Sequence, residues 1–325
     1  MKRTVSIQAV LLAALAGFAV LDSIALAQTY PSKPVRILVG FAPGGGTDIM
    51  ARVVGAKLAD ALKQQFIVDN RPGANANLAA KIAAEAPGDG YTILFMSVAH
   101  IMSKPVYKNL GYDIERDLAP ITVVSSVPNV LCVHPSLPAR SVKDLIALAR
   151  AKPGEMTYAT SGVGSPEHFA GEMFKMMTKT NLLAIPYKGG GPIAIDLVAG
   201  HVISSFNTMP PIIPHIRANR VRALAVTTEK RASVLPDVPT VGESVPGYVM
   251  STWYGAVAPV KTPRDIVQRL NHEIVKTLAL ADVKEKLANL GADVVGTTTD
   301  ETAAIFKADL AKFTKVAKAA NIRAD

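Results

Sequence analysis

Short apolar segments alternate with helix-forming segments along most of the chain, and this alternation constrains the fold more than any other feature. Residues 35–41 are an apolar run typical of a buried strand. Over 47–63 the apolar side chains recur on one helical face, and strand patterns at 66–68 and 91–96 flank a helical segment at 77–85. Such an order forms a parallel sheet with right-handed crossovers. The sequence therefore predicts an α/β fold.

The middle of the chain repeats this scheme, and the C-terminal part is helical. The further predicted strands are at 121–133, 156–160, 182–186, 202–206, 222–226 and 253–258. The further predicted helices are at 141–151, 263–290 and 299–320, with one more after the loop 161–166 that runs to about 178 and one after 189–192 that ends at 200. The long extended crossings near Pro128 and Ser251 are candidate hinges. We predict two lobes with a cleft between them, each a mostly parallel sheet flanked by helices. One comprises residues 28–127 plus 252–325, and the other residues 128–251.

The N-terminus has the layout of a secretory signal peptide. Lys2 and Arg3 precede an apolar stretch at about 7–21, and a small-x-small cleavage pattern ends at Ala27. The alternative is an uncleaved anchor helix, which Asp22 makes less favourable because it shortens the apolar run. We expect residues 1–27 to be removed on export.

Composition excludes several classes of protein. With 49% hydrophobic and 19% charged residues, the 325-residue chain can bury a sizeable core, so disorder is not its main state. No second apolar run of about 20 residues follows the N-terminus, which excludes a multi-span membrane protein. The single cysteine, Cys132, lies in a strand-like apolar segment, and it excludes a disulfide scaffold or a cysteine-cluster zinc site. The net charge of +9 comes from scattered Lys and Arg, which favours anionic small molecules over nucleic acid.

Three glycine-rich turns follow predicted strands, at residues 41–48, 160–165 and 187–191. Open α/β sheets bind ligands at the carboxyl ends of their strands. Glycine lets the backbone N–H groups approach a ligand, and the helix that follows adds its positive dipole end. The turns therefore predict an anion cradle, although three ordinary tight turns are the alternative. None has the full pattern of a nucleotide-binding loop.

Three side chains near these turns invite a functional interpretation. A carboxylate facing an anion would repel it, so we expect Asp48 to point away and stabilise the start of its helix. His168 lies one short turn into the helix after Ser165, at the cleft side, which favours ligand contact; His100 is a weaker case. The sequence contains neither the His-Glu-x-x-His motif of metalloproteases nor a Gly-x-Ser-x-Gly elbow.

Nine short motifs recur in a specific order along the mature chain: Tyr30–Arg36, Phe41–Asp48, Asn70–Ala74, Pro87–Tyr91, Tyr158–Ser165, Pro186–Pro192, Arg222–Val226, Leu235–Thr240 and Trp253–Gly255. Together they resemble the Bug proteins, the TctC-like extracytoplasmic solute-binding proteins of tripartite tricarboxylate transporters. The resemblance implies a monomeric periplasmic binding protein of the Venus-flytrap type. Such a protein closes on a small carboxylate and delivers it to a two-component integral membrane transporter, without catalysis or a cofactor.

The resemblance also implies which residues bind the ligand, mainly through backbone amides of the first glycine loop. They are Phe41, Ala42, Gly44, Gly45, Thr47, Ser97, Val98, Ser161, Gly162, Gly164, Ser165, His168, Tyr187 and Asn207. Many relatives carry aspartate where this chain has Asn207, which removes an anchor for a ligand amine. A di- or tricarboxylate and an aromatic acid both remain open as ligands.

Two other functions remain open on the sequence. A ligand-loaded sensor partner of a membrane receptor would have the same binding chemistry. A carboxylate-processing enzyme would need a nucleophile and a base in contact, and Ser165 with His168 is the candidate pair.

Overall fold

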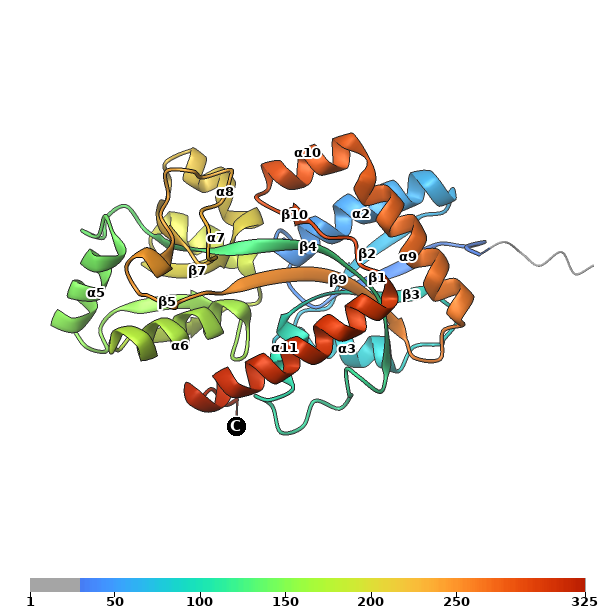
Figure 1. The fold of residues 1–325 in the computed structure, drawn as a ribbon, viewed down its shortest axis with the longest axis horizontal. Helices are drawn as coiled ribbons and strands as arrows, with labels where there is room; N and C mark the ends of the chain where they lie inside the picture. Colours follow the sequence, from blue (N-terminus) through green and yellow to red (C-terminus); the bar gives the residue numbers. More distant parts are fainter. Residues whose placement is uncertain (1–29, 325) are drawn as a thin grey trace, which may run out of the picture. The chain divides into compact units, whose positions relative to one another are not determined.

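Two long antiparallel strands run side by side and join the two ends of the sheet (Figure 1). They are β4 (Leu118–Val133) and β9 (Ser251–Pro259), paired from Leu118↔Pro259 to Pro128↔Ser251. The computed structural model describes residues 30–324, and Lys33–Asp325 form one compact unit, discussed below. The predicted signal peptide lies outside the described residues.

The strands at one end of the sheet have the parallel order that the sequence predicts. β1 pairs in parallel with β2 and with β3, and β3 pairs antiparallel with β9. The elements of this end are β1 (Val35–Val39), α2 (Gly46–Leu62), β2 (Phe66–Asn70), α3 (Asn77–Ala84), β3 (Thr92–Ser97) and the short α4 (Ala99–Ser103). β1 and β3 are buried on both faces, which explains why their sequences are continuously apolar.

The other end repeats this design on the far side of β4. β5 pairs in parallel with β6 and β7, while β7 and β8 pair antiparallel with β4. The elements here are α5 (Val142–Ala151), β5 (Thr157–Thr160), α6 (Pro166–Thr178), β6 (Leu183–Pro186), α7 (Gly190–Ala199), β7 (Ser204–Thr208), α8 (Met209–Arg217), β8 (Arg222–Val226) and the 3₁₀ turn η2 (Val241–Glu243). The mixed α/β class agrees with the sequence prediction.

The helix predicted as continuous over 263–290 is interrupted. It forms α9 (Arg264–Ala279) and α10 (Ala281–Asn289), with an extended backbone at Leu280. Leu278 and Val283 are both buried although they are five positions apart, a spacing that would place them on different faces of one helix. The break realigns the apolar stripe. Two elements follow, β10 (Asp293–Val294), which pairs with β4, and α11 (Thr299–Ala319).

Aromatic side chains of the C-terminal helix α11, which is red in Figure 1, pack against aromatic side chains of β9 and α6. Its Phe306 stacks on Trp253 of β9, with ring centroids 5.3 Å apart. Its Phe313 meets Phe169 of α6 edge to face, with ring centroids 5.5 Å apart.

Cys132 is fully buried, and burial raises the pKa of its thiol. Among the described residues, no helix is both long and apolar enough to cross a membrane.

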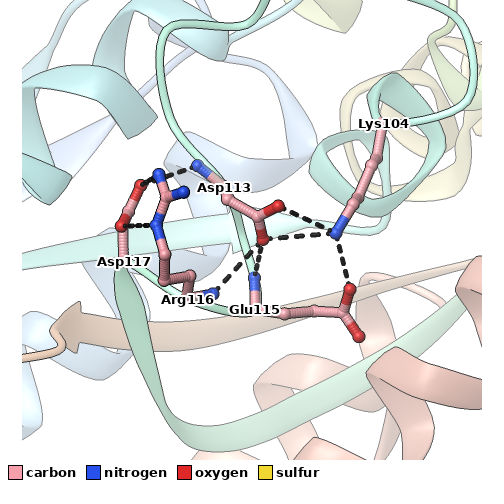
Figure 2. Close-up of polar contacts among 5 residues, drawn as sticks. All are labelled: Lys104, Asp113, Glu115, Arg116 and Asp117. Atoms are coloured by element: carbon pink, nitrogen blue, oxygen red, sulfur yellow. Dashed lines mark hydrogen bonds and ion pairs between the residues drawn. The ribbon is translucent and has the colours of Figure 1, made fainter.

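The connection from α4 to β4 is held by charged side chains (Figure 2). Lys104 Nζ donates to Asp113 Oδ1 at 3.2 Å and to Glu115 Oε2 at 2.6 Å. Asp113 Oδ1 also accepts the backbone N–H groups of Glu115 and Arg116, and Arg116 pairs with Asp117. These contacts order a segment that has little regular secondary structure, and that segment carries Tyr107.

Candidate functional site

The first residues of three helices meet at one small cavity. Gly46 and Thr47 begin α2, Pro166 and Glu167 begin α6, and Gly190 begins α7. The first turn of a helix has backbone N–H groups without intrahelical partners and the positive end of the helix dipole. The cavity of about 20 Å³ therefore has the electrostatics of an anion site.

The remaining walls come mostly from the ends of strands. The lining residues outside the three helices are Phe41, Gly45, Ser97, Ser161, Thr208, Thr252 and Tyr254. Ser97 and Thr208 are the last residues of β3 and β7, and Phe41 and Ser161 follow β1 and β5 closely. The parallel strands at both ends of the sheet thus direct their carboxyl ends to one place, as expected of a ligand site in an open α/β sheet.

The first and third glycine loops touch beside this cavity. The N–H of Ala42 donates to the carbonyl oxygen of Lys188 at 2.8 Å. A Cβ on Gly191 would lie 2.7 Å from the carbonyl oxygen of Pro43, so this approach requires glycine. A Cβ on Gly45 would have no neighbour nearer than 3.5 Å, which is ordinary contact.

A polar network holds the first glycine loop on α2. Asp48 Oδ2 accepts the N–H of Gly44 at 2.9 Å, and Arg52 Nε donates to the Asp48 carboxylate at 3.0 Å. Asn70 Nδ2 donates to the carbonyl oxygen of Phe41 and to Asp48 Oδ1, both at 3.0 Å. Burial by itself would raise the pKa of Asp48, but the hydrogen bonds from Arg52, Gly44 and Asn70 lower it below its ordinary value. Asp48 thus stabilises the start of the helix, as predicted, and is absent from the cavity lining.

The second glycine loop is organised by the helix that follows it. Ser165 Oγ accepts the backbone N–H of His168 at 3.2 Å and caps α6. The His168 ring accepts the N–H of Gly164 at its Nδ1 atom, and its Nε2 atom lies 3.8 Å from Glu172 Oε1. Burial lowers the pKa of His168, although Glu172 opposes this, so the ring is neutral near pH 7. The Ser165 hydroxyl is thus engaged with backbone and not with the imidazole.

Five of the fourteen predicted site residues line the cavity: Phe41, Gly45, Thr47, Ser97 and Ser161. The other nine are absent from the lining: Ala42, Gly44, Val98, Gly162, Gly164, Ser165, His168, Tyr187 and Asn207. Among these nine, Tyr187 Oη donates to Asp196, and Asn207 Nδ2 donates to the carbonyl oxygen of Gly190 at 3.1 Å. That all fourteen bind a ligand stays a prediction.

Sequence reasoning did not select seven of the lining residues, namely Gly46, Pro166, Glu167, Gly190, Thr208, Thr252 and Tyr254. Gly46, Gly190 and Tyr254 lie inside motifs that the sequence analysis quoted, so a signal existed for them. Glu167 had no signal in the sequence, because an acid in the first turn of a helix is usual and does not indicate a binding site. Its burial distinguishes it: Glu167 is 3% exposed, and its Oε2 atom has no hydrogen-bond partner in the structure.

Tyr254 reaches the cavity because Gly46 has no side chain. A Cβ on Gly46 would overlap the Tyr254 hydroxyl and lie 2.8 Å from its Cζ atom and 3.0 Å from Thr208 Oγ1. Burial raises the pKa of Tyr254, and the nearby Glu167 adds to this, so the phenol is neutral. Across residues 30–324, no Lys or Arg side chain lines the cavity, and no cluster of three His, Cys, Asp or Glu could hold a metal ion.

Comparison with known proteins gives one consistent family. The model of TctC, described as the tripartite tricarboxylate transporter family receptor, matches residues 50–322. Protein BugT of Bordetella pertussis is 38% identical over 279 residues, covering 85% of this chain and 86% of BugT. A solved R. palustris protein with adipate is 39% identical, with a TM-score of 0.88, covering 90% of this chain and 99% of that one. Periplasmic binding protein BugD is 31% identical, with the same TM-score and coverage. The chain therefore belongs to the TctC family of tripartite tricarboxylate transporter receptors.

Proposed function

We propose that this protein captures a small carboxylate in the cavity between its two lobes and delivers it to a two-component membrane transporter. The observation that carries the proposal is the meeting of three helix N-termini at one cavity. Their N–H groups and dipoles favour an anion, and a carboxylate needs several such donors. The family description and the predicted export signal support a periplasmic location.

The ligand class follows from the chemistry of the walls and from one relative. Adipate, the ligand named for the R. palustris structure, is a chain with a carboxylate at each end. Hydroxyls from Thr47, Ser161 and Thr208 supply neutral hydrogen-bonding groups here. We infer an aliphatic di- or tricarboxylate, or an aromatic acid, carried unchanged. Catalysis is not part of the proposal, because the Ser165 hydroxyl caps α6 and leaves the imidazole of His168 without a nucleophile.

Capture requires the two lobes to separate. A cavity of about 20 Å³ has room for about one water molecule, whereas ligand pockets usually measure roughly 300 Å³ or more. We propose that residues 28–127 with 252–325 move relative to residues 128–251. The hinges would lie where Pro128 of β4 pairs with Ser251 of β9. Donors from both lobes then surround the ligand only in the closed form, and this difference in contacts shifts the equilibrium toward closure.

Hydrogen bonds from backbone amides can account for much of a micromolar affinity. A micromolar dissociation constant corresponds to about −8 kcal/mol. Hydrogen bonds to a charged group contribute about 1.5–3 kcal/mol each, so a few amide donors supply much of that value.

A thermal-shift screen tests the ligand class. The purified protein is heated with aliphatic di- and tricarboxylates, aromatic acids and acidic amino acids. A ligand that binds only the native state raises the melting temperature by mass action, and a tighter ligand raises it more at the same concentration. We expect a selective shift with a carboxylate that is recovered unchanged. Conversion of the ligand, or no shift with any carboxylate after removal of bound material by unfolding and refolding, would contradict the proposal.

A pair of substitutions at Gly45 tests the cradle itself. Gly45→Asp places a second negative charge beside the N–H groups of Gly190 and Gly191, and we expect it to abolish carboxylate binding. Gly45→Ala is the matched control, because its Cβ would meet neighbours at 3.5 Å or more. It should fold and retain binding within a few-fold. If folded Gly45→Asp binds as well as the parent, the cavity is not the anion site.

A further inference from the structure

Glu167 is an acid in a place where the proposed ligand is also an acid. It is the single charged side chain among the described residues that line the cavity. Its side chain is 3% exposed, and its Oε2 atom has no hydrogen-bond partner. A buried carboxylate oxygen without a hydrogen-bond partner costs free energy unless it is protonated or a ligand supplies the partner.

The groups around Glu167 are neutral. Ser161 and Ser165 face its carboxyl from the second glycine loop, and Tyr254 faces it from β9. From α2, α7 and the ends of β3 and β7 the lining consists of glycines, hydroxyls and backbone. The next residue on its own helix, His168, is turned to Gly164 and Glu172. Within the described part of the chain, Glu167 thus has no cationic partner lining the cavity.

We propose that Glu167 takes up one proton from solvent when a carboxylate ligand binds, and that its carboxyl O–H then donates to a carboxylate oxygen of that ligand. This inference rests on the proposed function, since it concerns the same cavity. The balance is simple: an ionised Glu167, an ionised ligand and one proton combine into a single hydrogen-bonded acid–carboxylate pair. No covalent bond forms or breaks apart from the O–H bond of Glu167.

The position of Glu167 in the cavity lining is the reason for this coupling. Gly46 and Gly190 begin the helices that attract a ligand carboxylate, and they line the same cavity as Glu167. Two ionised carboxylates in such a site repel each other, and paired carboxylates respond by sharing a proton. Burial already raises the pKa of Glu167, although Ser161 and Ser165 oppose the rise, so the proton is taken up readily.

Calorimetry measures the proton directly. Adipate is titrated into the parent protein between about pH 5 and about pH 9, in pairs of buffers that differ in ionisation enthalpy. The buffer dependence of the heat gives the number of protons taken up. We expect little uptake at the acidic end and a rise toward one proton per ligand as pH increases. The dissociation constant should increase by up to about tenfold per pH unit over the same range, because binding weakens.

Two variants assign the proton to Glu167. Glu167→Gln keeps the shape and cannot ionise, so we expect flat affinity across pH, no proton uptake and binding at alkaline pH that is tighter than in the parent. Glu155→Gln is the control, because it removes an acid whose side chain is 67% exposed and remote from the cavity lining. It should keep the uptake of the parent. Thermal melting without ligand checks that both variants fold.

The outcomes separate this inference from the proposed function. Carboxylate binding without proton uptake at any pH, or uptake unchanged in Glu167→Gln, would overturn the role of Glu167 and leave the carrier function intact. Loss of carboxylate binding in folded Glu167→Gln would also overturn it, because an ionised Glu167 would then be serving as an acceptor for an ammonium or hydroxyl group. If no carboxylate binds the parent, the proposed function itself fails.

Discussion

The hydroxyl of Tyr107 donates a hydrogen bond to the carbonyl oxygen of Val163 at 2.9 Å. Tyr107 belongs to the connection that follows α4, and Val163 lies in the second glycine loop. The bond therefore joins segments that we assign to different lobes. A Cβ on Gly164 would lie 3.5 Å from the Tyr107 ring and 3.4 Å from Asn75, so the loop also packs closely on this side. We interpret the contact as a latch of the closed form.

Removal of this latch should weaken ligand capture. Tyr107→Phe deletes the hydroxyl and keeps the ring, at a cost of about 1 kcal/mol for one hydrogen bond, or roughly fivefold in affinity. The unliganded protein should open further, which small-angle X-ray scattering detects as a larger radius of gyration. Tyr112→Phe is the control, because the Tyr112 hydroxyl bonds Asn77 within one lobe. Equal affinity in Tyr107→Phe and the parent would show that the bond does not contribute to closure.

Asp48 should stabilise the fold in a pH-dependent way. Its folded pKa lies below the ordinary value of 3.8, so its contribution is fully present above about pH 4 and is lost as pH falls through the folded pKa. Asp48→Asn should lower the free energy of unfolding at pH 7 by about 1–3 kcal/mol, because the charged hydrogen bonds to Arg52 are lost. Urea unfolding at pH 7 and at about pH 3 should show the difference shrinking at the lower pH. Asp60→Asn, an exposed change on the same helix, should have little effect; a pH-independent loss in Asp48→Asn would refute the linkage.

Local patterns determined much of what the sequence predicted correctly. The strand–helix order follows from apolar periodicity, and the meeting of the glycine loops follows from their place after parallel strands. Asp48 was placed correctly because an acid in a first helical turn has a simple electrostatic reason to be there. The break at Leu280 had a signal in the five-residue step from Leu278 to Val283, which a single-helix interpretation overlooked.

The other parts of the site depend on contacts between distant segments. Tyr254 lines the cavity because β9 returns beside β3 and because Gly46 leaves space for its ring, and neither condition is local. Glu167 lines the cavity and its Oε2 atom has no partner, whereas Asp48, also in a first helical turn, is held by Arg52. Part of this difference is visible in the spacing, because Arg52 lies four residues after Asp48 on the same helix, whereas Gly171 occupies that place after Glu167. The burial of Glu167 is not visible there, because the cavity is formed by residues of several other strands and helices.

The fit between Gly46 and Tyr254 predicts a specific rescue. Gly46→Ala should destabilise the protein by about 1–3 kcal/mol, because the new methyl group overlaps the Tyr254 hydroxyl. Tyr254→Phe removes the overlapping oxygen, so the double variant should recover part of the loss. A double-mutant cycle in urea measures the coupling between the two positions. Strictly additive effects would show that the two side chains do not compete for the same space.

The buried, ionised carboxylate of Asp309 should lower the free energy of unfolding at neutral pH. Burial raises the pKa of this carboxyl above its ordinary value, although the Trp253 Nε1–H, which donates to Asp309 at 2.6 Å, and Lys312 oppose the rise. A raised acid pKa means that stability falls as pH rises through the unfolded and then the folded value. Asp309→Asn removes the buried charge and keeps an acceptor for Trp253, so it should be more stable than the parent at pH 7 and similar near pH 3 in urea unfolding.

Trp253→Phe completes this last test, because it leaves Asp309 buried without its donor. That variant should be less stable than the parent at pH 7, and part of its loss should disappear at acidic pH as Asp309 takes up a proton. The stacking of the ring on Phe306, with planes 11° apart, is largely retained by phenylalanine, which limits the loss to the hydrogen bond and some buried area. If Asp309→Asn is instead less stable than the parent at pH 7, the charged bond to Trp253 outweighs the burial of the carboxylate, and α11 is held on β9 by an ionised Asp309.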